Sequence, residues 1–184
     1  MGSPTEATLA SATAIDLFRN GDLPNHGSDG KLWLQYWMFY YYNALNVETI
    51  GLHEGDFEMI QVALDAAGQP SEAVYAQHNG GERCPWSGVE HAGGIPVVYV
   101  AKHSHASYYT PNRVHHILDR ADGQGGGLFA PDLESIASNA PRWVAWPGQW
   151  GADGPVGPRF NSDGLKWNNP TGWADSESVS GCSG

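Results

Sequence analysis

The sequence at positions 53–64 reads HEGDFEMIQVAL, and from Asp56 onward it alternates as a β-strand does. Successive strand side chains point to opposite faces, so Asp56 and Glu58 share a face with the apolar residues at positions 60, 62 and 64. That face is expected to point into the core, where two carboxylates are costly unless they are neutralised or hydrogen-bonded. The run therefore predicts a strand over Asp56–Leu64 with two acidic side chains that need partners.

Two kinds of partner are compatible with this pattern. A bound cation, with His53 a few residues upstream, would neutralise Asp56 and Glu58 together. Alternatively, both carboxylates lie at the open end of the sheet and accept hydrogen bonds from loop amides. Taken alone, the D-x-E pattern favours the hydrogen-bonded interpretation, and the rest of the chain shifts the balance toward the cation.

Composition predicts a β-rich protein. The 184 residues include 24 Gly and 12 Pro, which indicates many turns and few long helices. The net charge of -11 argues against nucleic acid or an anionic membrane surface as a partner and suits a cation or a neutral ligand. No apolar run is long enough to predict a membrane-spanning helix. The first residues lack a signal-peptide pattern, so cytoplasmic location and secretion as a mature form both stay open.

Aromatic residues dominate Leu32–Asn43, which is apolar on both faces and predicts a central strand covered on each side. Further strands are predicted over Ala73–Gln77 and Pro96–Lys102, with turns at 66–70 and 79–83.

The expected fold is mainly β: a single-domain β-sandwich over 1–184 with short peripheral helices. Two such helices are predicted, over Leu9–Arg19 and Pro131–Asn139. The predicted layout is a helix and loop lead-in at 1–30, core sheets at 31–140 and a tryptophan-rich, loop-dominated segment at 141–184.

The two cysteines, Cys84 and Cys182, allow two interpretations. A disulfide between them would attach the C-terminal segment to the body of the protein and would indicate an oxidising compartment. Two free thiols would carry no special meaning, and neither spacing nor neighbours suggest a zinc site.

Three histidines are candidates for proton transfer. His103 and His105 form an H-x-H pair that would share one face of a strand, and His78 follows the predicted strand at 73–77. Imidazoles suit metal binding or acid–base catalysis near neutral pH. A single such histidine is more often structural, but three at strand ends beside inward carboxylates predict a shared pocket.

Several motifs together resemble the vacuolar protein sorting-associated protein 62 family. In order along the chain they are LQYWMFYYYN at 34–43, HEGDFE at 53–58, YAQH at 75–78, VYVA at 98–101, SHA at 104–106 and WPG at 146–148. The resemblance covers roughly Lys31 to Trp173. It departs at Phe57, where Trp is expected, and at His103, where Gly is expected, and it carries over no settled biochemical role.

The spacing His-x-x-Asp-x-Glu after an aromatic strand is also similar to the heptapeptide region of the necrosis- and ethylene-inducing-like proteins. These are β-sandwich cytolysins that hold a divalent cation and recognise glycosylated sphingolipids. The similarity implies cation binding by His53, Asp56 and Glu58, with Asn43 where an acidic ligand is expected. An amide there weakens binding of Mg²⁺ or Ca²⁺, while the imidazole leaves Mn²⁺, Fe²⁺ or Zn²⁺ open.

Two functions follow from these candidates. In the first, the protein is an enzyme acting on a small neutral molecule: a divalent cation acts as a Lewis acid, and His78, His103 or His105 transfers protons. In the second, it is a binding module or cytolysin-like toxin whose cation binds the sugar hydroxyls of a glycan or glycolipid. The additional His103 favours the enzyme slightly.

Overall fold

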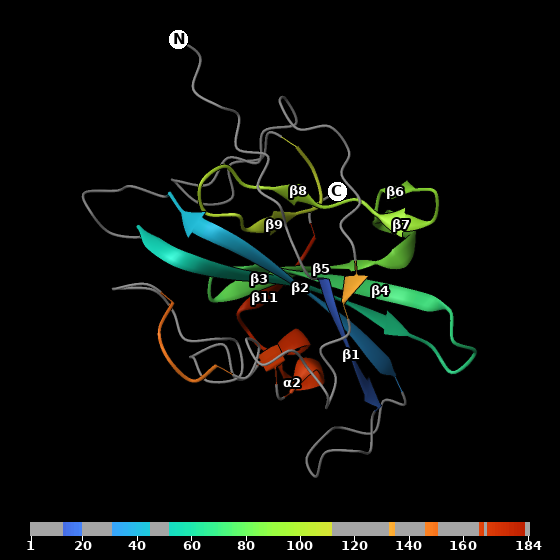
Figure 1. Cartoon of the computed structure of the whole chain (residues 1–184). Coiled ribbons are helices and arrows are strands. Elements are labelled where there is room, and N and C mark those ends of the chain that lie inside the picture. The colour runs from blue at the N-terminus through green and yellow to red at the C-terminus, as the bar shows by residue number, and fades with distance from the viewer. Residues whose placement is uncertain are drawn as a thin grey trace.

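The fold of the protein is mainly β and is built on a seven-stranded sheet (Figure 1). The computed structural model describes residues 13–19, 31–44, 52–111, 133–134, 146–150, 166–167 and 169–182. The strands lie in the order β10-β1-β2-β3-β4-β5-β11. Their bounds are Thr13–Arg19 for β1, Leu32–Asn43 for β2, His53–Leu64 for β3, Pro70–Gln77 for β4, Gly80–Pro85 for β5, Leu133–Glu134 for β10 and Val179–Gly181 for β11. Strands β1 to β5 are antiparallel, and the two edge strands pair in parallel.

Smaller elements cover both faces of this sheet, which gives a sandwich-like arrangement. In Figure 1 two short hairpins lie above the sheet and helix α2 lies below it. The hairpins are β6 with β7 (His91–Ala92 and Ile95–Pro96) and β8 with β9 (Tyr99–Val100 and Ser107–Tyr108), and α2 spans Pro170–Ala174. A 3-10 turn, η1, covers Trp86–Gly88. Among the described residues, no helix has the length and apolar character needed to cross a membrane.

Each face of the sheet has its own core. The core on the α2 side consists of the buried residues Trp33, Trp37, Met59, Ala63, Val74, Ala76, Trp167, Trp173 and Ala174. The core on the hairpin side consists of Ile60, Val62, Ala73, Tyr75, Cys84, Val89 and Tyr109. Neighbours on one strand therefore enter different cores, as strand alternation requires. This confirms that the aromatic strand β2 and the acidic strand β3 are central and covered on both sides.

Buried amides attach the C-terminal segment to the α2 side. Gln35 on β2 and Gln61 on β3 have no exposed surface, and their side chains hydrogen-bond across the strands at 3.0 Å. Nε2 of Gln35 also donates to the carbonyl of Lys166 at 2.5 Å, and Nε2 of Gln61 donates to the carbonyl of Pro170 at 3.0 Å. Because buried polar groups left unpaired are costly, these amides select one docking position for the segment.

A charged network joins the same segment to β4 and β5. The Glu72 carboxylate binds Lys31 and Arg83, and Arg83 Nη1 lies 2.7 Å from Oδ1 of Asp175. Burial raises the pKa of Glu72, but hydrogen bonds and charge from Arg83 and Lys31 outweigh that effect and lower the pKa below its usual value.

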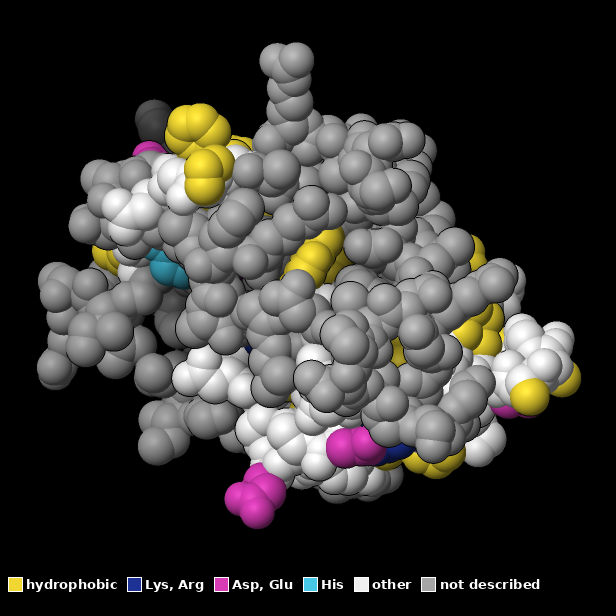
Figure 2. All heavy atoms as spheres, turned by 90° about the horizontal axis from the view of Figure 1, so that it is seen from below, with side chains coloured by type: hydrophobic (Ala, Val, Ile, Leu, Met, Phe, Trp, Pro, Cys, Tyr) yellow, Lys and Arg dark blue, Asp and Glu magenta, His cyan; other side chains and the backbone are white. Residues whose placement is uncertain are grey.

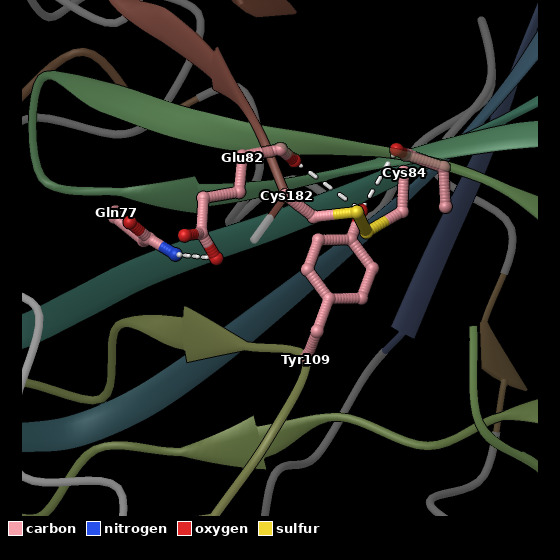
Figure 3. The surroundings of a disulfide bond; sticks show 6 residues. Gln77, Glu82, Cys84, Tyr109 and Cys182 are labelled. Atoms are coloured by element: carbon pink, nitrogen blue, oxygen red, sulfur yellow. Dashed lines mark hydrogen bonds between the residues drawn. A yellow bond between two sulfur atoms is a disulfide. The ribbon is translucent and has the colours of Figure 1, made fainter. Parts of the chain in front are cut away.

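Cys84 and Cys182 form a disulfide, which decides between the two interpretations of the cysteines. Their Cα atoms lie 5.2 Å apart, and the bond joins β5 to the residue that follows β11 (Figure 3). Beside it, the Tyr109 hydroxyl donates to the carbonyls of Ala73 at 2.7 Å and Glu82 at 3.2 Å. The short parallel strand β11 is therefore tied to the sheet covalently.

On the side seen in Figure 2, the hydrophobic side chains of the described residues form separate groups. Five large hydrophobic residues among those described are exposed: Tyr41, Tyr42, Leu52, Ile95 and Trp146.

Both predicted helices were wrong where the structure describes them. Thr13–Arg19 is strand β1, because Ala14 to Arg19 pair with the exposed edge that the long strand β2 provides. Leu133–Glu134 is strand β10, which pairs with β1. Tertiary pairing overrides the weak local preference for helix in these segments. The remaining positions of both predictions, 9–12, 131–132 and 135–139, lie outside the described residues.

Two other predictions needed correction. The turn predicted over 79–83 is limited to His78 and Asn79, because Gly80–Pro85 is strand β5. The strand predicted over 96–102 is divided between β7 and β8, and residues after Val100 turn back toward β9.

Candidate functional site

The two acidic residues of β3 are buried at the end of the sheet that lies nearest the β2–β3 connection. Asp56 and Glu58 are 7% and 8% exposed. In the antiparallel ladder Asp56 is opposite Tyr40 of β2, and His53 is opposite Asn43. The sequence-based prediction of a strand with inward carboxylates is thus confirmed, and the partners of these carboxylates define the candidate site.

Asp56 has two hydrogen-bond partners from different parts of the fold. Its Oδ2 accepts a hydrogen bond from Nδ2 of Asn43 at 3.1 Å and lies 2.8 Å from Nδ1 of His105. An ionised carboxylate can only accept, so Nδ1 of His105 carries the proton in this contact. The contacts are of the kind that the hydrogen-bonded interpretation of Asp56 requires, and they bring together three of the predicted site residues.

His105 reaches Asp56 from a tight turn between β8 and β9. The turn is closed by two backbone hydrogen bonds, from Ala101 N–H to the Ala106 carbonyl at 2.9 Å and from His105 N–H to the Ala101 carbonyl at 3.1 Å. His105 has a φ of 60° and His103 a φ of 76°, so both are in the left-handed region. The prediction that they share one face of a strand was wrong, because alternation holds only for extended backbone.

The two histidines of this turn have different environments. His105 points inward, and its side chain is 12% exposed. His103 is exposed, and its carbonyl accepts a hydrogen bond from the Ala44 N–H at 3.2 Å, which fastens the turn to the end of β2. His103 therefore contributes its backbone to this end of the fold, whereas His105 contributes its imidazole.

Tyr40 lies flat against His105. The ring centroids are 4.0 Å apart and the ring planes differ by 4°, while Tyr40 itself is 5% exposed. Burial raises the pKa of the Tyr40 phenol, and the negative charges of Glu58 and Asp56 raise it further. The phenol is therefore neutral near physiological pH, and both carboxylates act electrostatically on this one side chain.

His78 belongs to a different place on the surface. It lies in the β4–β5 turn with a φ of 51°, and its carbonyl accepts a hydrogen bond from Nζ of Lys166 at 2.6 Å. The turn borders a cavity of about 450 Å³ whose lining also includes Glu82 and Ser180. Asp56 and His105 do not line this cavity.

The predicted metal ligands are assembled only in part. Asn43 and Asp56 are in contact, and Nδ1 of His53 is buried with no hydrogen-bond partner among the described residues. Among the residues that the structure describes, no three His, Cys, Asp or Glu side chains are grouped so that they could hold one metal ion.

The sequence did not assign two residues of this region to the site: Tyr40 was expected in the core, and Ser104 was discounted as a nucleophile because neighbouring strand residues face opposite ways. Tyr40 was assigned to the core as one of several aromatics of β2, and only the register between β2 and β3 places it opposite Asp56. Ser104 is 1% exposed, and its buried hydroxyl has no hydrogen-bond partner in the part of the chain that the structure describes. Its carbonyl lies 3.5 Å from Nδ2 of Asn43. The position of Ser104 between two histidines was its only signal in the sequence.

No protein-family model, curated protein or solved structure matches this chain. The two family resemblances therefore stay predictions that rest on their motifs.

Proposed function

We propose that the protein is an enzyme in which His105 acts as a general base on a small neutral molecule. The observation that carries this proposal is the contact between Asp56 Oδ2 and His105 Nδ1 at 2.8 Å. With the proton held on Nδ1, the lone pair of the ring is on Nε2, and Nε2 makes no hydrogen bond to any described residue. A histidine oriented in this way by a carboxylate is a common arrangement for proton abstraction.

Asp56 and Asn43 would support His105 during the reaction. After His105 accepts a proton on Nε2, the ring is positively charged, and the adjacent Asp56 carboxylate stabilises that charge. Asn43 donates to the same carboxylate oxygen at 3.1 Å and so fixes its direction. The proton would then return to the product from Nε2, and the original tautomer of His105 would be restored.

The polar atoms around Asn43 favour a small, uncharged, hydrogen-bonding ligand. The Ser104 hydroxyl and Nδ1 of His53 are both buried and have no partners among the described residues, and a ligand or water could satisfy them. The nearby carboxylates Asp56 and Glu58 disfavour an anionic substrate. A neutral polar molecule fits both observations.

A divalent cation remains part of this proposal as an assisting group. Asp56 and Glu58 lie two positions apart on β3 and are 7% and 8% exposed, so two carboxylates are buried close together on one strand. Such a pair, with His53 and Asn43, would be the protein's contribution to holding the ion, which would supply Lewis-acid stabilisation of developing negative charge.

Metal binding has its own test. If these side chains hold an ion, equilibrium dialysis should find about one divalent ion per chain, and Asp56→Asn and Glu58→Gln should each abolish binding. Glu54→Gln, at an exposed position of the same strand, is a matched control that should leave binding unchanged. Absence of binding by the wild-type protein would remove the cation from the proposal and leave the Asp56–His105 pair.

Glycan binding is the second candidate function. Tyr42, which precedes Asn43 on β2, is 38% exposed, and an exposed aromatic ring beside polar groups suits stacking on a sugar. In this case the ligand would be released unchanged.

One set of variants separates the two functions. Neutral small molecules and oligosaccharides that raise the thermal stability of the protein are incubated with it and analysed for products. We expect His105→Gln to abolish turnover of an active compound, because the amide cannot accept and return a proton. His103→Gln, at the exposed position two residues away, should retain turnover. Ligands that bind the wild-type protein and are always recovered unchanged would contradict the enzyme proposal and favour glycan binding.

A further inference from the structure

We propose that Tyr40 is a positioning residue that fixes the plane of the His105 imidazole and thereby the direction of its Nε2. This inference deepens the proposed function and rests on it where catalysis is concerned. The orientation of the ring can nevertheless be measured without a substrate.

The hydrogen bond to Asp56 alone does not define the orientation of the ring. It holds Nδ1 at 2.8 Å from Oδ2 of Asp56, and small turns about the χ1 and χ2 torsions of His105 keep that contact while they tilt the plane of the ring. Such a tilt changes the direction of the lone pair on Nε2. Since misplacement of a catalytic group by about 1 Å can cost on the order of 100-fold in rate, a base of this kind needs a second constraint.

The Tyr40 ring supplies that constraint. With the two rings 4.0 Å apart and within 4° of parallel, any tilt of the imidazole drives one of its edges into the face of the phenol. A centroid distance of 4.0 Å between nearly parallel rings means that their faces are in van der Waals contact, so little free space remains between them. The stack and the hydrogen bond together leave one orientation of the imidazole.

The backbone positions of both stacked residues, Tyr40 and His105, are fixed by the surrounding fold. Tyr40 belongs to the central strand β2, directly opposite Asp56 in the ladder, and is 5% exposed. His105 starts from a short turn with two backbone hydrogen bonds and a left-handed backbone at φ 60°. A non-glycine residue is held in this region only when its surroundings determine it, and such residues occur often at functional sites.

Tyr40 could instead be only a core residue, and its variants distinguish the two roles. Tyr40→Phe keeps the ring and removes only the hydroxyl, whose contact is with Sδ of Met38 at 3.8 Å. Tyr40→Leu removes the ring face but keeps an apolar side chain. Tyr41→Leu is the matched control, because Tyr41 is the next residue of the same strand and is 74% exposed.

The first measurement is nuclear magnetic resonance of the His105 ring. In the wild type and in Tyr40→Phe we expect one tautomer, protonated on Nδ1, and ring protons shifted upfield by the stacked aromatic ring. Tyr41→Leu should give the same signals. Tyr40→Leu should keep the Nδ1 tautomer, which Asp56 fixes, but should show ring protons averaged over several orientations of the imidazole. The wild-type spectrum is itself a test if Tyr40→Leu fails to fold: ring protons without upfield shift, or without cross-relaxation to the Tyr40 ring, would overturn the proposal.

The second measurement is turnover of whichever compound the enzyme test identifies. Tyr40→Leu should lower kcat on the order of 100-fold with little change in KM, and Tyr40→Phe should restore it. If the ring signals change as expected but no compound is turned over by the wild type, the positioning role stands and the proposed enzyme function fails. If the His105 ring of Tyr40→Leu keeps one orientation, seen as unchanged cross-relaxation to its neighbours other than position 40, Tyr40 is a core residue only.

Discussion

Loss of the Cys84–Cys182 disulfide should destabilise the whole protein by several kcal/mol. The two cysteines are 98 positions apart, and a cross-link over about 100 residues lowers the entropy of the unfolded chain by an amount worth about 4.7 kcal/mol at 25 °C. For 184 residues with an unfolding entropy of about 2.1 cal/mol/K per residue, this corresponds to a fall in Tm of about 12 °C. The effect arises in the unfolded state, so it does not require any change in the folded sheet.

The assay is calorimetry of the oxidised protein, the reduced protein and Cys182→Ser. Serine is placed at position 182 because Cys84 is 1% exposed, and a hydroxyl there would add the separate cost of a buried polar group. Hydrogen exchange at β11 reports whether the edge strand also opens locally. A fall in Tm below about 3 °C, with both thiols shown to be free, would refute the loop-entropy reasoning and indicate that the bond protects only the end of the chain.

Two further predictions concern stability. Gly55→Ala should lower the free energy of unfolding, measured in urea, by about 2 kcal/mol or more, because Gly55 has a φ of 72° and an added Cβ would overlap Trp150. Gly68 has a similar φ of 75° but open space around it, so Gly68→Ala should cost only about 1 kcal/mol. Equal losses in the two variants would contradict the packing argument. Because the folded-state pKa of Glu72 is lowered, its stabilisation is present above its ordinary value of 4.5 and is lost as pH falls through the folded value. Glu72→Gln should therefore destabilise the protein at pH 7 and have much less effect near pH 3, and a loss independent of pH would rule out the ion pairs with Arg83 as the cause.

The central part of the fold was predictable because its signals are local. The alternation in β3 and the two-sided apolar pattern of β2 describe which face each side chain must take, and pairing between the strands preserves that assignment. Strand β1 was not predictable, since its apolar residues also fit a helix and only the available edge of β2 decides between the two. The H-x-H pair failed for a related reason, because two left-handed residues replace the extended backbone that alternation assumes.

The candidate site was predictable as a set of residues but only in part as a geometry. The buried carboxylate Asp56 and its neighbour Asn43 lie on paired strands, so the sequence could place them near each other. The stack of His105 on Tyr40 joins residues 65 positions apart through a turn that folds over the sheet. No periodic pattern encodes such a contact, because it depends on the register of β2 against β3 and on the conformation of the turn.

The polar end of β3 argues for function independently of any single contact. On one face of this strand Ile60 and Val62 enter an apolar core, yet Asp56 and Glu58 continue the same face with carboxylates. Apolar side chains there would extend the core, whereas a buried carboxylate carries a desolvation penalty that its hydrogen bonds at best offset. Ser104 adds a buried hydroxyl that no described residue hydrogen-bonds, at a cost of about 1–3 kcal/mol unless another group, water or a ligand satisfies it. These buried polar groups are the feature that the proposed ligand-binding or catalytic role would explain.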